Sequence, residues 1–171
     1  AMKSIIIGHR GEVGGALYEI LSPVHEVWGI DQEGEIEYRW GKERTGFGGI
    51  PRDTGKIENL DLMHVCLRYD DRFHGIVRDY LVRFQPRLVD ICTTVPPGTT
   101  ERFGPNAVHS TTRGQHPHLA QGLGVIPKHV SGPRANEVAL YYRKAGLTCV
   151  TNPNPRTTEV NHDLNNVHYG I

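Results

Sequence analysis

The chain has 171 residues, of which 37% are hydrophobic, and this length allows one domain with a core of its own. Nineteen basic and nineteen acidic residues give a formal net charge of zero, which excludes a global field that would attract nucleic acid or an anionic membrane. The longest apolar runs are strand-sized, far below the roughly 20 residues of a bilayer-spanning helix, so the sequence is typical of a cytoplasmic protein.

An apolar run followed by spaced glycines opens the chain. Residues 5–7 are isoleucines that predict a buried parallel strand, and an amphipathic helix is expected from Val13 onward. Glycines between the two let the backbone turn tightly and leave the first N–H groups of the helix facing outward, a geometry that accepts a pyrophosphate. We therefore assign this turn to cofactor binding: Gly8, His9, Arg10, Gly11, Glu12, Val13 and Gly14.

A second apolar run, 27–30, ends in Asp31. An acidic side chain about 20 residues beyond the glycines accepts hydrogen bonds from the adenosine ribose hydroxyls, and it favours NAD over NADP because a 2′-phosphate would meet like charge. Gln32 is assigned to the same contact. The glycine spacing is one residue longer than the usual GxGxxG, so a turn that binds nothing is the alternative. Arg10 is either a phosphate partner or a solvated cation.

Strand and helix patterns then alternate along the chain. Residues 35–40 predict a short strand or hairpin, and 46–51 a ligand-covering loop. A strand is expected at 62–67, whose end adds Leu67 and Arg68 to the cofactor site. Asp70 and Asp71 are cap candidates for the next helix, which Pro86 ends, and a further strand covers 87–92. The expected apolar face of that helix consists of Phe73, Ile76, Val77, Tyr80, Leu81 and Phe84.

The second half continues this alternation. Strands are expected at 107–110, 128–131 and 147–150, with a helix at 134–144 and a final helix from Thr157 onward. The pattern predicts an α/β fold: a Rossmann-type, doubly wound, mainly parallel sheet in a single domain that ends in a helix. We divide the chain into a NAD-binding domain, 2–156, and the start of a C-terminal helix, 157–171.

Residues 93–101, TTVPPGTTE, resemble the motif that follows a central strand in the UDP-glucose/GDP-mannose dehydrogenase family. The segment HSTTRG resembles that family's YSPER, PKHVSG its strand and glycine, and TEVNHDLNN the start of its long central helix. The wider group, the 6-phosphogluconate dehydrogenase-like Rossmann proteins, includes prephenate dehydrogenase, whose glycine loop resembles GHRGEVG. Its catalytic histidine would align near His109.

The resemblance implies roles for two residues. Thr94 matches a threonine beside nicotinamide and a catalytic water, and Asn166 matches an asparagine that helps to hold the oxyanion. The chain departs from the family at Thr112, where a glutamate is usual, and at His162, where a lysine is usual. The half that carries the family's nucleophilic cysteine is also outside this sequence, so the family's two-step oxidation is not expected of this chain alone.

Hydride transfer also needs a general base. His109, His116 and His118 are the densest group of titratable side chains, and His109 is the leading candidate because imidazole takes a proton near neutral pH. The alternative is that these are loop histidines bonded to backbone. His116 and His118 lack a third ligand nearby, so no metal is predicted.

Other candidate residues have structural alternatives. Thr93, Thr94, Thr99 and Thr100 could cap a short helix that begins after Pro97 rather than serve catalysis. Arg113 and Lys128 are either anion-binding or solvated surface charges. The three cysteines, Cys66, Cys92 and Cys149, are expected to be buried thiols, neither disulfide-bonded nor nucleophilic.

Together these patterns predict a NAD-dependent oxidoreductase, or its cofactor-binding part, acting on a CH–OH group of a small molecule. An anionic or sugar-nucleotide substrate is expected, with further contacts from a second subunit, and a homodimer joined through the terminal helix. A NAD-binding sensor or regulatory module without catalytic activity is the alternative, and an inactive relative is a third. Neither nucleic acid nor membrane is expected as a partner.

Overall fold

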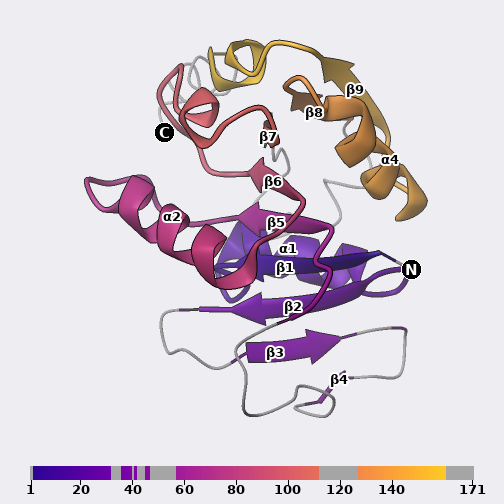
Figure 1. The fold of residues 1–171 in the computed structure, drawn as a ribbon. Helices are drawn as coiled ribbons and strands as arrows, with labels where there is room; N and C mark the ends of the chain where they lie inside the picture. The colour runs from indigo at the N-terminus through magenta and orange to yellow at the C-terminus, as the bar shows by residue number, and fades with distance from the viewer. Residues whose placement is uncertain are drawn as a thin grey trace.

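A computed structural model describes residues 2–31, 36–39, 41, 45–46, 57–111 and 127–160. Its elements alternate between strand and helix along most of the chain (Figure 1). They are, in order, β1 (Lys3–Ile7), α1 (Glu12–Leu21), β2 (Glu26–Ile30), β3 (Ile36–Arg39), β4 (Thr45–Gly46), β5 (Leu62–Val65), α2 (Phe73–Phe84), β6 (Leu88–Ile91), the 3-10 helix η1 (Thr100–Phe103), β7 (Ala107–Ser110), β8 (Lys128–Ser131), α4 (Ala135–Lys144) and β9 (Cys149–Asn152). Residues 156–160 are also helical.

The nine strands of the described residues form one sheet in the order β4-β3-β2-β1-β5-β6-β7-β8-β9. Pairing is parallel from β2 through β1, β5 and β6 to β7, and again between β8 and β9. The antiparallel pairs are β2–β3, β3–β4 and β7–β8. The α/β class and the mainly parallel sheet are therefore confirmed, with an antiparallel hairpin added at the β2 edge.

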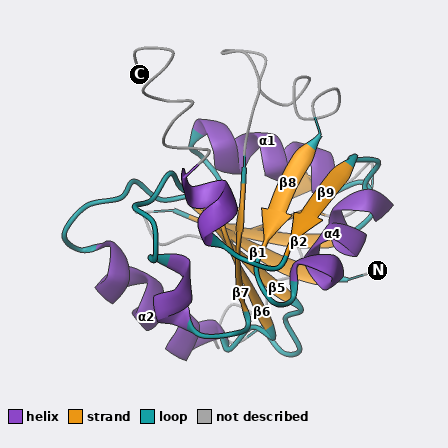
Figure 2. Ribbon diagram, turned by 90° about the horizontal axis from the view of Figure 1, so that it is seen from above, coloured by secondary structure: helices purple, strands orange, loops and turns teal. Residues whose placement is uncertain are grey.

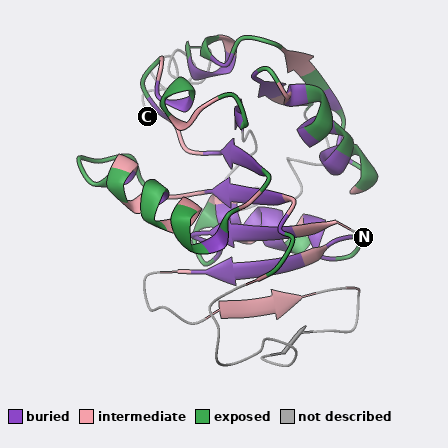
Figure 3. Cartoon of the chain, viewed as in Figure 1, coloured by how far each residue is buried: buried purple, intermediate pink, exposed green. Residues whose placement is uncertain are grey.

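Helices cover both faces of the sheet (Figure 2). One core contains Leu17 and Leu21 of α1 together with Tyr141 and Tyr142 of α4, and the other contains Phe73 of α2. The central strands are buried along their length, while the outer surface of α2 is exposed (Figure 3). Strands buried on both faces are the reason that their sequences are nearly continuous apolar runs.

The expected α2 helix is confirmed, with a different start. Arg72 occupies the N-cap position without a side-chain cap bond, so neither Asp70 nor Asp71 is the cap residue. The Asp70 carboxylate instead accepts the backbone N–H of Arg72, one step before the helix. The helix ends at Phe84 because Gln85 adopts a left-handed φ of 46° immediately before Pro86.

Two strand boundaries also differ from the expected ones. β5 ends at Val65 rather than residue 67, and the last strand is Cys149–Asn152 rather than 147–150. Gly146, with φ of 89°, turns the chain out of α4, and Leu147 is buried in the connection instead of pairing in the sheet. The final helix begins at 156, one residue before its expected start.

In the part of the chain that the structure describes, every helix is too short or too polar to cross a bilayer.

Candidate functional site

The turn between β1 and α1 is tight at two glycines. Gly8 has a left-handed φ of 89°, and a Cβ there would lie 2.5 Å from the carbonyl oxygen of Cys66 at the end of β5. A Cβ on Gly14 would lie 2.1 Å from the Gly8 carbonyl oxygen, so a side chain would force α1 away from β1. Gly8 and Gly14 are therefore the positions that demand glycine in the predicted motif.

The first turn of α1 faces outward without a side-chain cap. Gly11 is the N-cap residue, and as a glycine it has no side chain with which to cap the helix. The N–H groups at a helix start have no partner inside the helix, and the helix dipole adds positive potential there. The arrangement is suited to an anion.

Asp31 lies beside this turn, as the sequence predicts. It follows β2, and its Oδ2 accepts the backbone N–H of Arg10 at 3.1 Å. An acidic side chain 21 residues beyond Arg10 thus lies next to the start of α1.

The guanidinium of Arg10 is paired within the protein. Its Nη2 lies 2.6 Å and its Nε 3.1 Å from Oε1 of Glu37 on β3. The expected alternatives, a phosphate partner or a solvated cation, omitted this carboxylate. His9 is buried beside it, with Nε2 3.2 Å from Oε2 of Glu37.

The segments after β5 and β6 meet at the same edge of the sheet. The Thr93 hydroxyl lies 2.6 Å from the carbonyl oxygen of Leu67 and 3.2 Å from that of Val65. A Cβ on Gly8 would also lie 3.5 Å from the Leu67 side chain. The structure therefore brings Leu67 to the glycine turn. Arg68, the next residue, is exposed, and Thr94, which follows Thr93, is half-buried.

The turn after β6 is capped by a distant carboxylate. Glu159 is fully buried, and its two oxygens accept the N–H of Gly98, the N–H of Thr100 and the hydroxyl of Thr100, each at 3.0 Å. Thr99 is the N-cap residue of η1 but its hydroxyl donates to the Pro96 carbonyl. The interpretation of Thr99 and Thr100 as side-chain caps of this helix is therefore wrong.

His109 lies behind Thr93 rather than on the surface. Its Nε2 donates to the Thr93 carbonyl at 3.0 Å, and its Nδ1 lies 2.8 Å from the hydroxyl oxygen of Thr158. Burial lowers the pKa of His109 and outweighs the bond to the carbonyl, which keeps the ring neutral at neutral pH. In this conformation the ring supports the turn after β6, and its assignment as general base stays a prediction.

A buried polar network lies under this edge, between the sheet and α4. Asp90 accepts hydrogen bonds from Ser110 at 2.6 Å, from His64 at 2.9 Å and from the Tyr142 hydroxyl. Burial alone would lower the pKa of His64, but the bond to Asp90 and its charge raise it to about 9. Burial alone would raise the pKa of Asp90, but His64 and its charge hold it below its ordinary value. His64 and Asp90 are register partners on β5 and β6, and sequence analysis did not connect them.

The same network contains a group of three metal-ligand types that sequence analysis missed. The ligand atoms of His64, Asp90 and Cys92 lie within 4.8 Å of one another. Burial raises the pKa of the Cys92 thiol well above its ordinary value, which disfavours the thiolate that zinc binds. Because the carboxylate also receives hydrogen bonds from protein donors, we interpret the group as a hydrogen-bonded network.

Lys128 is buried rather than exposed. Its Nζ donates to the Thr111 carbonyl at 2.7 Å and lies 4.8 Å from the centre of the Tyr142 ring. Both expected roles, a surface charge and an anion ligand, are corrected by this placement. The cysteines follow expectation more closely: all three are free, with Cys92 and Cys149 buried and Cys66 half-buried.

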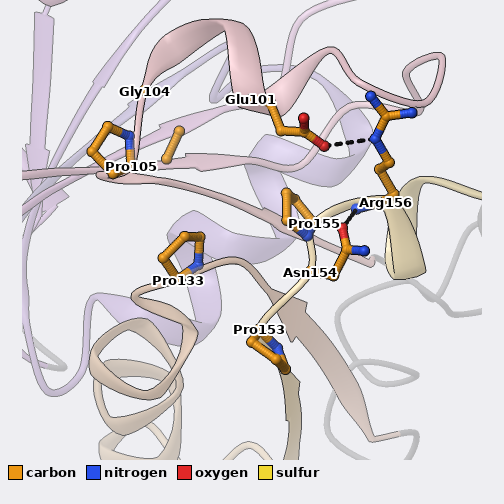
Figure 4. A pocket seen from close by; sticks show the side chains of 9 residues that line it. Glu101, Gly104, Pro105, Pro133, Pro153, Asn154, Pro155 and Arg156 are labelled. Atoms are coloured by element: carbon orange, nitrogen blue, oxygen red, sulfur yellow. Dashed lines mark hydrogen bonds and ion pairs between the residues drawn. The ribbon is translucent and has the colours of Figure 1, made fainter.

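A hollow of about 560 Å³ lies elsewhere, between η1, the start of β7 and the segments after β8 and β9 (Figure 4). Four prolines line it: Pro105, Pro133, Pro153 and Pro155. Its two charged residues pair with each other, since Nε of Arg156 lies 2.7 Å from Oε1 of Glu101. None of its lining residues belongs to the glycine turn.

Several predicted site residues lie outside the described residues: Gln32, Arg113, His116, His118 and Asn166. Glu37 and Glu159 are the site carboxylates that sequence analysis missed. The alternation of residues 35–40 already placed Glu37 on one face of a strand, and Glu159 stands in the first turn of the expected last helix. Neither signal indicates which distant residues the carboxylate contacts.

Comparisons with solved structures agree with this geometry. The chain is similar to UDP-D-ManNAc dehydrogenase from Pyrococcus horikoshii, with a TM-score of 0.73, 14% identity and coverage of 98% of this chain and 50% of that one. It is also similar to an imine reductase from Bacillus cereus BAG3X2, with a TM-score of 0.65, 10% identity and coverage of 99% and 61%. The domain has a Rossmann-type fold.

A third similar structure carries a dinucleotide. It is a reductive aminase from Aspergillus terreus in complex with NADPH and ethyl levulinate, with a TM-score of 0.62, 15% identity and coverage of 99% of this chain and 61% of that one. The chain thus spans between half and two thirds of these structures. No protein-family profile matches the chain, and no curated protein sequence matches it significantly.

Proposed function

We propose that this chain binds NAD(H) at the carboxyl edge of its sheet and serves as the cofactor-binding part of an oxidoreductase. The observation that carries the proposal is the meeting of Asp31 with the glycine turn, through the 3.1 Å bond to the Arg10 N–H. The Rossmann-type fold supports it, because ligands of such sheets bind at the carboxyl ends of the strands.

The glycine turn would hold the pyrophosphate. The positions of Gly8 and Gly14 leave no room for a Cβ, so these glycines allow the tight turn and the close packing of α1 against β1 that a dinucleotide turn needs. The uncapped start of α1 supplies N–H donors and the positive end of the helix dipole. Asp31 would accept the ribose hydroxyls, and its charge would oppose a 2′-phosphate, which favours NAD over NADP.

The turn after β6 would carry the contacts to the reactive end. When bound, the nicotinamide supplies or accepts a hydride. We assign Thr94 to contact with the cofactor or substrate, and His109 to positioning, since its Nε2–H bond fixes the Thr93 carbonyl. The Thr93 hydroxyl in turn joins the end of β6 to the end of β5.

The substrate would be a small hydroxyl-bearing molecule. An anionic compound or a sugar nucleotide is our first expectation, on the resemblance of residues 93–101 to the nucleotide-sugar dehydrogenase motif. The chain spans 50% of the UDP-D-ManNAc dehydrogenase structure. We propose that a second subunit adds substrate contacts to those of this chain.

Calorimetric titration with NADH and NADPH tests the binding. We expect NADH to bind the wild-type chain more tightly than NADPH, and Asp31→Ala to weaken NADH binding by about tenfold or more, since a hydrogen bond to a charged group contributes roughly 1.5–3 kcal/mol. Asp71→Asn, which removes an exposed charge beyond β5, is the matched control and should leave affinity unchanged. Failure of the wild-type chain to bind either coenzyme would overturn the proposal.

Turnover is a separate measurement. Nicotinamide absorbance should be followed with sugar nucleotides, hydroxy acids and prephenate as substrates. Binding of NADH without turnover of any of them would favour the sensor or regulatory alternative over an oxidoreductase.

A further inference from the structure

A charged group beside the glycine turn is not needed for the binding just proposed. It consists of His9 and Arg10 in the turn and Glu37 on β3. Arg10 forms two hydrogen bonds to one oxygen of Glu37, at 2.6 and 3.1 Å, and His9 lies 3.2 Å from the other oxygen. One carboxylate therefore contacts both side chains of the turn, the Arg10 guanidinium and the His9 ring.

The hairpin at the sheet edge brings Glu37 to this position. β3 pairs antiparallel with β2, and Glu37 is the register partner of Gly29. Its neighbours Ile36 and Tyr38 pack into the α2-side core, so alternation directs Glu37 to the face that carries α1. The His9 ring lies against Gly29, where a Cβ would come within 2.3 Å of it, and so fills the space between the turn and β2.

Arg10 and Asp31 stand at the same point with opposite charges. The Arg10 backbone N–H donates to Asp31, the carboxylate that we assign to the ribose. The guanidinium of Arg10 is therefore within one side-chain length of that carboxylate. An arginine favours a phosphate on that ribose, because its planar fork matches phosphate oxygens, whereas Asp31 repels one. The pairing of Arg10 therefore determines which of the two charges prevails.

We propose that Glu37 determines dinucleotide choice by holding Arg10, so that the guanidinium is engaged within the protein and the ribose end selects a free 2′-hydroxyl. The inference rests on the proposed function and identifies Glu37 as a specificity-determining residue of the same site. It predicts that Arg10 is a built-in 2′-phosphate ligand, and that its two hydrogen bonds to Glu37 keep it from that role.

The charge state of Glu37 is consistent with this role. Burial alone would raise its pKa, but hydrogen bonds from Arg10 and His9 outweigh burial and lower it, so the carboxylate is ionised at neutral pH. A 2′-phosphate would have to separate Arg10 from Glu37 and then lie near two carboxylates. Both effects act against NADPH and neither acts against NADH.

The test compares dissociation constants for NADH and NADPH in four proteins: wild type, Glu37→Gln, Arg10→Gln and the double variant. Glu37→Gln should tighten NADPH binding about tenfold while NADH affinity changes less than about twofold. Adding Arg10→Gln should remove that gain. Glu19→Gln, on the exposed side of α1, removes the same charge without touching Arg10 and should change neither constant.

Arg10→Gln alone provides an independent check if Glu37→Gln does not fold. In the wild-type background the arginine is already held, so its loss removes no phosphate contact and, by leaving Glu37 unneutralised, should weaken NADPH binding by no more than about twofold. A loss of about tenfold or more, as expected when a direct guanidinium–phosphate contact is removed, would overturn the inference. Adenosine 2′,5′-bisphosphate, compared with adenosine 5′-monophosphate, should reproduce the coenzyme preferences and so locate the effect at the ribose.

The outcomes separate the two proposals. A wild-type chain that binds neither coenzyme refutes the proposed function and this inference with it. A wild-type chain that binds NADH, with an unchanged NADPH-to-NADH ratio in Glu37→Gln, refutes only the role of Glu37.

Discussion

Two turns at one edge of the sheet differ in how the N–H groups at the start of the following helix are capped. The turn after β1 and the turn after β6 both follow a buried parallel strand and both lead into a helix. At the first, Gly11 caps α1 without a side-chain bond. At the second, the buried carboxylate of Glu159 accepts the N–H groups of Gly98 and Thr100.

The difference shows how backbone donors become available to a ligand. Every helix start exposes N–H groups that need an acceptor. Where the chain supplies its own carboxylate, as Glu159 does, the turn becomes part of the core. Where it supplies glycine, as at Gly11, the same donors can serve a ligand. The four predictions that follow test this contrast.

The largest effect is expected beneath the second turn. Asp90→Asn removes the charge that His64, Ser110 and the Tyr142 hydroxyl surround, and breaking a buried ion pair costs roughly 3–5 kcal/mol. Urea denaturation should show this loss in the free energy of unfolding. Asp71→Asn, at an exposed site, should change it by less than about 0.5 kcal/mol. Equal, small losses in the two variants would mean that the network contributes little to the stability of the turn after β6.

The next largest loss of stability is expected when the Glu159 carboxylate, which caps the second turn, is removed. Glu159→Ala leaves the buried N–H and hydroxyl of Thr100 and the part-buried N–H of Gly98 without their acceptor, and we expect a loss of about 3 kcal/mol. Glu159→Gln keeps one acceptor oxygen and should recover part of it. If NADH affinity falls in these variants while stability does not, the second turn is a ligand site and the contrast fails.

A smaller change in stability is expected at the first turn, together with loss of binding. Gly14→Ala places a Cβ 2.1 Å from the Gly8 carbonyl, so α1 must shift, at a cost of about 1–3 kcal/mol. NADH binding should be lost, as calorimetry would show. Gly75→Ala is the control, because a Cβ in that exposed position of α2 meets no atom within 4 Å and should stabilise the helix slightly.

The most gradual effect is a pH dependence of stability, which is spread over several pH units. The folded pKa of His64, about 9, lies above its unfolded value of about 6.5, so this histidine stabilises the fold fully below pH 6.5 and progressively less as the pH rises through 9. The slope should not exceed about 1.4 kcal/mol per pH unit for one proton. Urea midpoints from pH 6 to 9.5 should fall in the wild type and fall less in His64→Leu; parallel curves would contradict the assignment.

The local structure was well predicted where one segment carries its own signal. The isoleucines of β1, the glycines after it and the apolar face of α2 all stand in the structure as their spacing indicates. Asp31 was placed correctly beside the turn because its role depends on the end of one strand. The exception is β9, where Leu147 is apolar enough for a strand but is buried in a connection.

What escaped prediction depends on long-range partners. Lys128 looks like a surface cation, yet the Thr111 carbonyl and the Tyr142 ring accommodate it in the interior. Glu159 meets backbone about 60 residues earlier, and Glu37 meets the turn only because β3 folds back antiparallel to β2. Such contacts are set by sheet order, which local periodicity does not encode.

The short helix at 156–160 is fastened to the sheet at two successive residues. Thr158 contacts His109, and Glu159 contacts the turn after β6. Anything that pulls on the chain beyond residue 160 therefore acts first on those two side chains. A displacement of this helix would be transmitted from Thr158 through His109 and Thr93 to the Leu67 carbonyl, at the carboxyl edge of the sheet.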